Sequence, residues 1–374
     1  MTLEWLYSLE HFGTKLGLER IKELLNKLNN PQSNLKCIHV AGTNGKGSVC
    51  AFLSSILKAN GYKVGMYTSP HLKRFTERIQ INGKEIEEAK LNQLIEKIKP
   101  LYTNQTFFEV TTAAAFQYFN EENVDIAVLE VGLGGRLDAT NVITPLISII
   151  THISLDHTHV LGKTINQIAK EKSGIIKENI PVITLAKNDA LKTIKKIAKQ
   201  HNSKVFIPKK QSLELGLKGN FQKENAALAI KAAELLNINK TAIRNGLKNA
   251  IWPRRFEFIE KNILVDCAHN LDGIKSLSKE IKKQKYEKII TVTGILKDKD
   301  KSNMVKEIAG FSDYIIFTRP KTDRAEDPKE LQKHTTKRSE IVLDVKEALK
   351  KAKKIANPGD LIVVAGSIYT VGEI

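Results

Sequence analysis

A lysine and a serine in a glycine-rich turn are the residues of this sequence best suited to chemistry. Lys46 and Ser48 follow a short apolar run at residues 38–41 and precede apolar residues at helical spacing. Glycines let backbone N–H groups approach a phosphate closely, and the start of a helix adds partial positive charge. Lys46 can reach the β- and γ-phosphates of a nucleotide, and the Ser48 hydroxyl can lie near Mg²⁺. A glycine turn without a ligand is the alternative, but the combination predicts an ATP site made of Gly42, Thr43, Asn44, Gly45, Lys46, Gly47 and Ser48.

Acidic and histidine side chains follow two further apolar runs. Residues 125–131 are typical of a buried parallel strand that ends at Glu130, and residues 145–151 predict another that leads to Asp156 and His157. Ligands of open α/β sheets bind at the carboxyl ends of strands, where the glycine-rich turn also lies. A carboxylate there suits Mg²⁺, which prefers oxygen ligands. A solvated glutamate at a strand end is the alternative interpretation.

Several motifs make the chain similar to the folate branch of the Mur ligase superfamily, the folylpolyglutamate and dihydrofolate synthases. The turn G-T-N-G-K-G-S departs from a Walker A loop, because Gly47 separates the lysine from the serine, and it resembles the ATP loop of that family. The stretches E-V-G-L-G-G-R-L-D-A-T-N at 130–141, E-K-S-G at 171–174 and D-C-A-H-N at 266–270 resemble it as well. The resemblance extends over nearly the whole chain. It implies an ATP-dependent ligase that joins L-glutamate to a folate through an acyl phosphate.

For the metal site, the resemblance implies that Ser69 and Glu130 bind magnesium and that His157 completes the shell with Ser48. Lys172 matches the lysine that becomes carbamylated in the superfamily. A carbamate is an anionic oxygen ligand that can hold a second metal ion, whereas a free ammonium would be repelled by it. Without the motif, an ordinary lysine on a helix surface would be the better interpretation. The expected catalytic residues are Lys46, Lys172 and His269.

For the folate substrate, the resemblance implies a pocket with an aromatic wall and a polar group, which suits a flat pterin ring. Two adjacent phenylalanines are otherwise most often core residues. Some bifunctional members carry an aspartate in the dihydropteroate site where this chain has Lys15, and a lysine cannot accept hydrogen bonds from the ring. We therefore expect folylpolyglutamate synthase activity and leave open whether dihydropteroate is used as well. The expected pocket residues are Thr106, Phe107, Phe108, Glu109, Leu137, Asp138 and Ala139.

The second half of the chain begins with a segment, Trp252–Phe256, that resembles the family's P-G-R-F. Arg255 is then the expected nucleotide-contacting arginine, and Arg254 replaces a glycine. A G-x-x-Q-x-x-N element at 219–225 supplies a further nucleotide contact in the family. Asp266 and His269, three residues apart, could instead be a pair of metal ligands, but no further ligands accompany them. The remaining contacts implied are Asn225 and Asp266 with ATP, and His269 and Ser367 with the incoming glutamate.

Apolar runs and helical spacing alternate along the chain. With 374 residues, of which 41% are hydrophobic, the chain can bury two cores. We expect an α/β protein with a P-loop ATP-binding domain and a mostly parallel sheet in residues 1–252. A smaller Rossmann-like domain is expected in residues 253–374, with the active site in the cleft between the two. Helices are expected, among others, in residues 1–30, 111–120 and 165–177.

Charge and cysteine content limit the partners. The net charge is +18, but the lysines are spread through nearly every expected helix and are not interleaved with the aromatic residues that stack on bases. We interpret them as solvated faces that also steer polyanionic substrates, and expect neither a nucleic-acid nor a membrane partner. No apolar run approaches the roughly 20 residues of a membrane span. Because Cys37, Cys50 and Cys267 lack C-x-x-C spacing, we expect no disulfide and a cytoplasmic location. We also expect a monomer.

Two other activities are alternatives to the folate ligase. A peptidoglycan-precursor ligase of the same superfamily usually carries an additional N-terminal domain, whereas the ATP loop of this chain begins at residue 42. An ATP-dependent nucleic-acid-binding protein is favoured by the charge alone. Release of ADP on adding folate and glutamate, as opposed to DNA or RNA, separates these possibilities. The preferred folate and the length of the polyglutamate product stay open.

Overall fold

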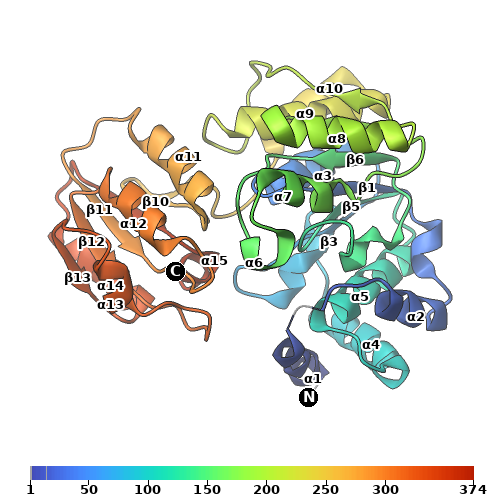
Figure 1. Ribbon diagram of the computed structural model, residues 1–374, viewed down its shortest axis with the longest axis horizontal. Coiled ribbons are helices and arrows are strands. Elements are labelled where there is room, and N and C mark those ends of the chain that lie inside the picture. The colour runs from blue at the N-terminus through green and yellow to red at the C-terminus, as the bar shows by residue number, and fades with distance from the viewer. Residues whose placement is uncertain (1, 14) are drawn as a thin grey trace. The chain divides into compact units, whose positions relative to one another are not determined.

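Two β-sheets organise the chain, one in each of two units (Figure 1). The computed structural model describes residues 2–13 and 15–374. Unit 1 consists of Met1–Gly216 and Gln222–Ile251, and unit 2 consists of Leu217–Phe221 and Trp252–Ile374. Unit 2 is therefore assembled from two separate stretches of sequence.

The sheet of unit 1 has eight strands, and six of them are parallel. Strands β1 (Cys37–Ala41), β5 (Ile126–Glu130) and β6 (Ile147–Ile150) are buried at every residue, as expected for continuous apolar runs covered on both faces. In the register of β1 with β5, Val40 lies opposite Glu130. The glutamate therefore lies beside the start of the glycine-rich turn. The strand order is β4 (Lys84–Glu85), β3 (Ile79–Ile81), β2 (Val64–Tyr67), β5 (Ile126–Glu130), β1 (Cys37–Ala41), β6 (Ile147–Ile150), β7 (Val182–Thr184), β8 (Val205–Phe206), with β3 and β4 antiparallel.

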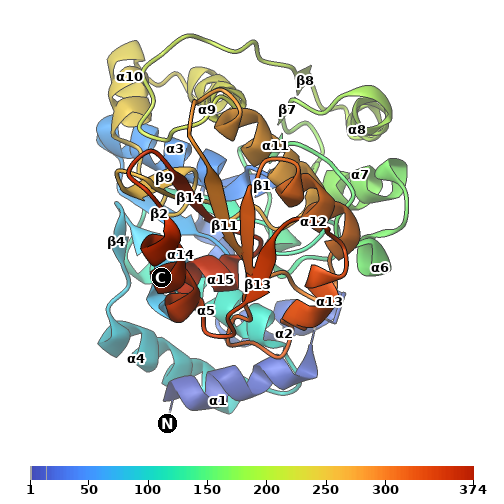
Figure 2. The same ribbon diagram turned by 90° about the vertical axis from the view of Figure 1, so that its left-hand side faces the viewer.

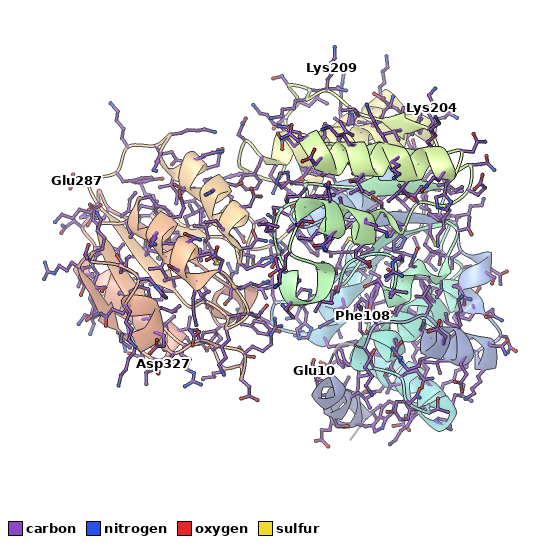
Figure 3. All side chains as sticks on the ribbon, in the orientation of Figure 1. Glu10, Phe108, Lys204, Lys209, Glu287 and Asp327 are labelled. Atoms are coloured by element: carbon purple, nitrogen blue, oxygen red, sulfur yellow. The ribbon has the colours of Figure 1, made fainter. Side chains whose placement is uncertain are left out.

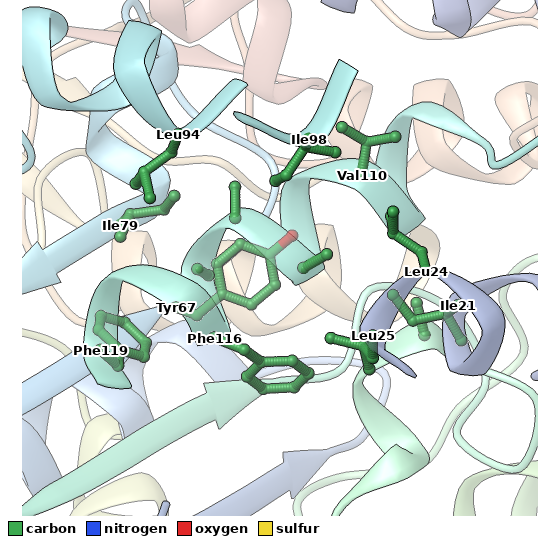
Figure 4. Packing of buried hydrophobic residues seen from close by; sticks show 14 of the residues in the cluster. Ile21, Leu24, Leu25, Tyr67, Ile79, Leu94, Ile98, Val110, Phe116 and Phe119 are labelled. Carbon is green, nitrogen blue, oxygen red and sulfur yellow. The ribbon is translucent and has the colours of Figure 1, made fainter. Parts of the chain in front are cut away.

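Helices cover both faces of this sheet. On one side α3 (Lys46–Ala59) packs against α9 (Gln222–Leu235) and α10 (Lys240–Asn249). On the opposite face α7 (Ile165–Ser173) and α8 (Asn188–Gln200) pack against each other and form a cluster with Ala41 and Ile150. On this opposite face, where α4 and α5 lie in Figure 1, Tyr67 and Phe116 lie at the centre of a buried cluster that Figure 4 shows. The helices around this cluster are α1 (Thr2–Ser8), α2 (Glu19–Lys27), α4 (Glu88–Ile98) and α5 (Phe107–Glu121).

Short helical turns connect these elements. One of them, α6 (Thr158–Leu161), follows the loop after β6. The others are the 3₁₀ turns η1 (Leu9–Phe12), η2 (Pro31–Asn34), η3 (Phe75–Arg78), η4 (Lys99–Leu101) and η5 (Ala139–Val142).

Unit 2 contains a six-stranded sheet in which only β9 is antiparallel. Figure 2 shows α11 (Leu271–Ile281) and α12 (Lys301–Ala309) on one side of the strands and α14 (Val345–Ile355) on the other. Two shorter helices, α13 (Pro328–Gln332) and α15 (Ile368–Gly372), complete the unit. The strand order is β13 (Ser339–Ile341), β12 (Tyr314–Phe317), β11 (Ile289–Thr293), β14 (Leu361–Ala365), β10 (Ile263–Val265), β9 (Glu257–Glu260).

The predicted fold class, α/β with mostly parallel sheets, is confirmed, but three expected helices have other bounds. The helix expected at 111–120 begins at Phe107, because the Thr106 hydroxyl caps it and Glu109 completes a capping box. The helix expected at 165–177 ends at Ser173. The helical stretch expected in residues 1–30 is interrupted after η1, where Gly13 has a positive φ of 63°. Among the described residues, no helix is both long and apolar enough to cross a bilayer.

Candidate active site

The ATP loop, residues 42–48, joins β1 to the first turn of α3. It is fastened to the end of β6: the Thr43 amide donates to the His152 carbonyl (2.8 Å) and the Thr151 hydroxyl donates to the Asn44 carbonyl (2.8 Å). A Cβ on Gly42 would lie 1.7 Å from the Thr151 hydroxyl oxygen, so only glycine allows this approach. Gly45 is the N-cap residue of α3 and offers no side chain to the first helical amides. A helix start without a side-chain cap favours an anion, so the geometry is compatible with the ATP site expected from the sequence.

Three residues predicted for ATP and metal binding meet beside this loop. The Lys46 Nζ donates to the Thr43 carbonyl (3.3 Å) and lies 3.8 Å from Glu130 Oε1. Glu130 Oε2 accepts a hydrogen bond from the Ser69 amide (3.2 Å). The ends of β1, β2 and β5 therefore bring Lys46, Ser69 and Glu130 together.

The start of α9 lies against the same loop. Gln222 Nε2 donates to the Ser48 hydroxyl (3.3 Å), and Asn225 Nδ2 donates to Gln222 Oε1 (2.8 Å). A Cβ on Gly45 would lie 2.3 Å from Asn225 Oδ1, which places the Asn225 side chain directly on the loop. Asn225 is thus close to Gly45 although 180 residues separate the two in the sequence.

Lys172 lies buried below the loop. Its Nζ donates to the Gly42 carbonyl (2.8 Å). Burial, together with the nearby charge of Lys46, lowers the pKa of Lys172 to about 7, and Asp156 and Asp138 oppose this shift. A lysine with such a pKa carries an appreciable fraction of neutral, nucleophilic amine near pH 7.

A second loop, residues 132–141, which we name the acceptor loop, packs against the helix that carries Lys172. A Cβ on Gly135 would lie 2.8 Å from the Lys172 carbonyl oxygen, so the two backbones are in direct contact. The Arg136 amide donates to the Glu171 carbonyl (2.8 Å). Asn141 Nδ2 donates to the Gly174 carbonyl (2.9 Å). The loop and α7 are therefore fixed to each other.

The predicted pocket residues of this loop differ in exposure. Asp138 and Ala139 are buried, and Leu137 is half-buried. Asp138 accepts hydrogen bonds from the Leu133 amide (2.8 Å), the Thr140 amide (3.0 Å) and the Thr140 hydroxyl (2.5 Å). Burial raises the pKa of Asp138, and these hydrogen bonds oppose the rise. The Asp138 carboxylate therefore already accepts hydrogen bonds from its own loop in the absence of a substrate.

The predicted pocket tetrapeptide, residues 106–109, lies at the start of α5 and contains two polar and two aromatic residues. Thr106 and Glu109 form the capping box, and Glu109 also pairs with Arg20 (3.0 Å), contacts that explain both residues without a ligand. The ring of Phe107 stacks on Tyr7, with 6.0 Å between centroids. Phe108, which is labelled in Figure 3, lies over Gly132, where an added Cβ would come within 2.5 Å of its ring. Phe108 is therefore the member that touches the acceptor loop.

The residues present provide oxygen donors suited to Mg²⁺. Ser48, Ser69 and Glu130 carry hydroxyl or carboxylate oxygens, the atoms that this ion prefers. His157 directly precedes α6 as its N-cap residue, with a positive φ of 49°, and its Nε2 lies 4.0 Å from Asp156 Oδ2. No group of three or more His, Cys, Asp or Glu side chains that could hold a metal ion occurs in residues 2–13 and 15–374. The set therefore fits an ion that takes further ligands from a nucleotide and water, and Lys172 fits it only with added oxygen atoms.

The predicted residues of unit 2 surround the end of β10. Asp266 is buried and accepts hydrogen bonds from the amides of Phe256 (2.8 Å) and Ala268 (2.8 Å). Burial raises the pKa of Asp266, and the charge of the half-buried Arg255 opposes the rise. His269 Nδ1 lies 3.0 Å from the Cys267 carbonyl, which accepts from it. Ser367 is buried and its hydroxyl caps α15 by accepting from the Thr370 amide (3.0 Å).

In the segment before β9, Arg254 stands where the resemblance leads us to expect a glycine. Arg254 has a φ of 61°, in the left-handed region that favours glycine. Its amide donates to Glu257 Oε2 (2.7 Å), and its carbonyl accepts from the Cys267 amide (3.1 Å). The backbone therefore keeps the conformation that a glycine would adopt, with an arginine side chain attached.

Sequence reasoning missed several residues that hold this site. Thr151 is the last residue of the apolar run 145–151 and directly follows β6, which ends at Ile150, and nothing in this run signals the contact with the ATP loop. Thr140 and His39 form a buried hydrogen bond (2.8 Å) that only the register of β1 reveals. Gln222 belonged to the recognised G-x-x-Q-x-x-N element, which was the one signal available, but no role followed from it.

Comparison with known proteins agrees with this arrangement. Residues 40–227 match the Mur ligase middle domain and residues 254–368 match the Mur ligase, glutamate ligase domain. The chain is 37% identical to the dihydrofolate synthase/folylpolyglutamate synthase of Bacillus subtilis, an alignment that covers 99% of this chain and 96% of that protein.

Solved structures are similar over the same length. E. coli FolC in complex with DHPP and ADP has a TM-score of 0.93 at 30% identity, covering 99% of this chain and 96% of that one. A bifunctional folylpolyglutamate synthase/dihydrofolate synthase with Mn, AMPPNP and L-glutamate bound has a TM-score of 0.92 at 31% identity, with the same coverage of 99% and 96%. The chain therefore belongs to the folylpolyglutamate synthase/dihydrofolate synthase family of Mur ligases.

Proposed function

We propose that this protein is an ATP-dependent ligase that adds L-glutamate to folates, with dihydropteroate as a second acceptor to be tested. The observation that carries the proposal is the meeting of Lys46, Ser69 and Glu130 at an uncapped helix start, in a chain with family similarity along its whole length. The assignment replaces the peptidoglycan-precursor ligase and the nucleic-acid-binding protein that were weighed from the sequence.

The reaction has two steps in this proposal. A carboxylate oxygen of the folate attacks the γ-phosphorus of ATP, so that an acyl phosphate forms and ADP leaves. The amino group of glutamate then attacks the acyl carbon, phosphate leaves with the bonding electrons, and the nitrogen loses a proton to give the amide. Lys46 and the amides of the ATP loop offset the negative charge that develops on the transferred phosphoryl group. The chain has no need of a covalent intermediate of its own.

The remaining roles follow from position and chemistry. Asn225, Arg255 and Asp266 would contact the nucleotide, and His269 and Ser367 the incoming glutamate. Phe108 and the acceptor loop would hold the pterin ring. When bound, Mg²⁺ neutralises phosphate charge, and the residues that would hold it are Ser48, Ser69, Glu130, His157 and the modified Lys172. We also propose residues 1–252 and 253–374 as the ATP-binding and glutamate ligase domains of a cytoplasmic monomer.

Carbamylation of Lys172 forms part of the proposal. The neutral amine attacks CO₂, an N–C bond forms, and one proton is released, leaving an anionic carbamate. The pKa of about 7 that burial gives Lys172 makes the neutral amine available for this step. Intact mass or electron density should show one added CO₂, and a small carboxylate should partly rescue Lys172→Ala. An unmodified Lys172 in active protein would exclude the carbamate.

The activity itself is tested by ADP release with tetrahydrofolate and dihydropteroate in parallel, each with and without L-glutamate. We expect ADP release that depends on glutamate and Mg²⁺, and a product heavier by one glutamyl residue. DNA and RNA serve as control polyanions and should release no ADP. Absence of glutamate-dependent ADP release with both acceptors would refute the proposed function.

A further inference from the structure

His39 is a buried polar residue in the middle of the most buried strand of the protein. It lies three residues before Gly42 on β1, between Leu129 of β5 and Ser148 of β6, and its side chain has no exposed area. An imidazole at such a position is costly unless its nitrogens are hydrogen bonded. Its Nε2 lies 2.8 Å from the Thr140 hydroxyl, on the acceptor loop. The ring therefore connects the strand that leads into the ATP loop with the loop proposed to receive the folate.

The direction of the hydrogen bonds follows from the number of protons available. The Thr140 hydroxyl has one proton, and it donates this proton to Asp138 Oδ1 (2.5 Å). The same oxygen must then accept from His39, so His39 carries its proton on Nε2. Nδ1 is buried and has no hydrogen-bond partner, which agrees with a neutral ring. The donors thus run in one direction, from His39 through Thr140 to the Asp138 carboxylate.

The direction of these hydrogen bonds determines whether the Asp138 carboxylate acts as a hydrogen-bond acceptor. A hydroxyl that donates to Asp138 supports the carboxylate as an acceptor, together with the amides of Leu133 and Thr140. These hydrogen bonds also join residues 133 and 140, so they close the acceptor loop on itself. Loss of the His39 donor would free the Thr140 hydroxyl to rotate and to compete for other acceptors. The carboxylate and the loop would then lose their fixed orientation.

We propose that His39 is a positioning residue for the folate acceptor: by donating to Thr140 it orients the Asp138 carboxylate and fixes the acceptor loop. The inference rests on the proposed function, because it assigns the loop to the acceptor. His39 itself is fully buried and touches no substrate. Its loss should therefore affect the acceptor far more than the nucleotide, although His39 lies on β1, the strand that leads into the ATP loop.

The test compares two substitutions of nearly equal size. His39→Gln can place its amide Nε2–H₂ where the ring Nε2–H lies, whereas His39→Leu fills the space and has no donor. We expect His39→Leu to raise KM for the acceptor about tenfold, the worth of one buried hydrogen bond, with KM for ATP changed less than about twofold. His39→Gln should return KM for the acceptor to within about threefold of the wild-type value. Equal effects of Gln and Leu, or an equal rise in KM for ATP, would overturn the proposal.

A second pair of variants covers the case in which His39→Leu does not fold. Thr140→Val removes the hydroxyl and keeps the shape, and Thr140→Ser keeps the hydroxyl. Only Thr140→Val should raise KM for the acceptor, and equal effects of the two would contradict the proposal.

Nitrogen-labelled histidine NMR gives a readout that does not depend on activity. We expect a neutral His39 ring protonated at Nε2 near pH 7. A ring protonated at Nδ1, or at both nitrogens, would refute the hydrogen-bond order even in an active enzyme. If the NMR result holds and no acceptor is ligated, the proposed function fails and with it the acceptor role of His39, while the hydrogen-bond order stands.

Discussion

The ATP loop and the acceptor loop follow neighbouring parallel strands, yet they are held in place by different means. The ATP loop is fastened by main-chain groups and by hydroxyls of other segments, such as the Thr151 hydroxyl on the Asn44 carbonyl. The acceptor loop is fastened by its own buried side chains, above all Asp138. In the first loop the residue proposed for chemistry, Lys46, contributes little to holding the loop. In the second loop the proposed binding group and the structural support are the same carboxylate.

The largest effect should come from Lys46→Ala, which tests the first half of this comparison. Lys46 is half-buried and makes one long hydrogen bond within the loop, so its loss should leave the fold intact. Activity should fall about 10²–10³-fold or more, since a charge that stabilises the transition state is removed. Glutamate-dependent ADP release measures activity, and thermal unfolding controls for the fold. Wild-type activity in a well-folded variant would remove Lys46 from the site.

Gly135→Ala should disturb both the structural support of the acceptor loop and its proposed binding of the substrate. The added methyl group would meet the backbone of Lys172 at 2.8 Å, so the loop or α7 must shift, at a cost of about 1–3 kcal/mol. Activity and unfolding free energy, measured by urea titration, should fall together. Gly61→Ala is the matched control, because Gly61 has a positive φ of 93° but open space around it. It should lose stability and keep activity; an active Gly135→Ala would contradict the close contact.

The buried support of the acceptor loop should also give a pH dependence. Burial, with a smaller contribution from Lys177, lowers the pKa of His39 to about 3, below the 6.5 of a free histidine. Between these values the unfolded chain binds a proton that the folded chain does not, so stability is lost as pH falls below about 6.5. From pH 7.5 to about 5.5 the wild type should lose about 1 kcal/mol more than His39→Gln, by urea unfolding. An equal loss of unfolding free energy in both proteins would show that the pH dependence comes from groups other than His39.

The smallest effect concerns the segment before β9, where a buried carboxylate again holds a loop. Asp266 fixes the Phe256 amide, and Arg254 nearby has a φ of 61°. Replacing Arg254 by glycine or alanine removes the same side-chain contacts, but only glycine suits this φ. The Gly variant should therefore be more stable than the Ala variant by about 0.5–1 kcal/mol in urea unfolding. An Ala variant equal to the Gly variant would show that the segment relaxes to another conformation.

The sequence predicted the parts of this site that depend on local order along the chain. Strand, turn and helix at 38–57 are local features, so the ATP loop and the strand end at Glu130 could be located from apolar runs and glycines. Contacts that depend on strand register and on helix packing could not be predicted. Thr151, His39 and Gln222 form hydrogen bonds with residues more than 100 positions away in the sequence. The predicted helix at 111–120 starts four residues late, because the capping box of Thr106 and Glu109 places the start of α5 at Phe107.

The assignment of Leu217–Phe221 to unit 2 means that no single cut separates the two units. The ring of Phe221 packs edge to face on Phe256, with 6.2 Å between centroids, and borders the apolar core of unit 2. A fragment that begins at residue 253 would leave that part of its core uncovered and should be less soluble than one that carries residues 217–221 on a short linker. The same arrangement makes residues 217–221 and 252 poor places for a tag, a protease site or a circular permutation.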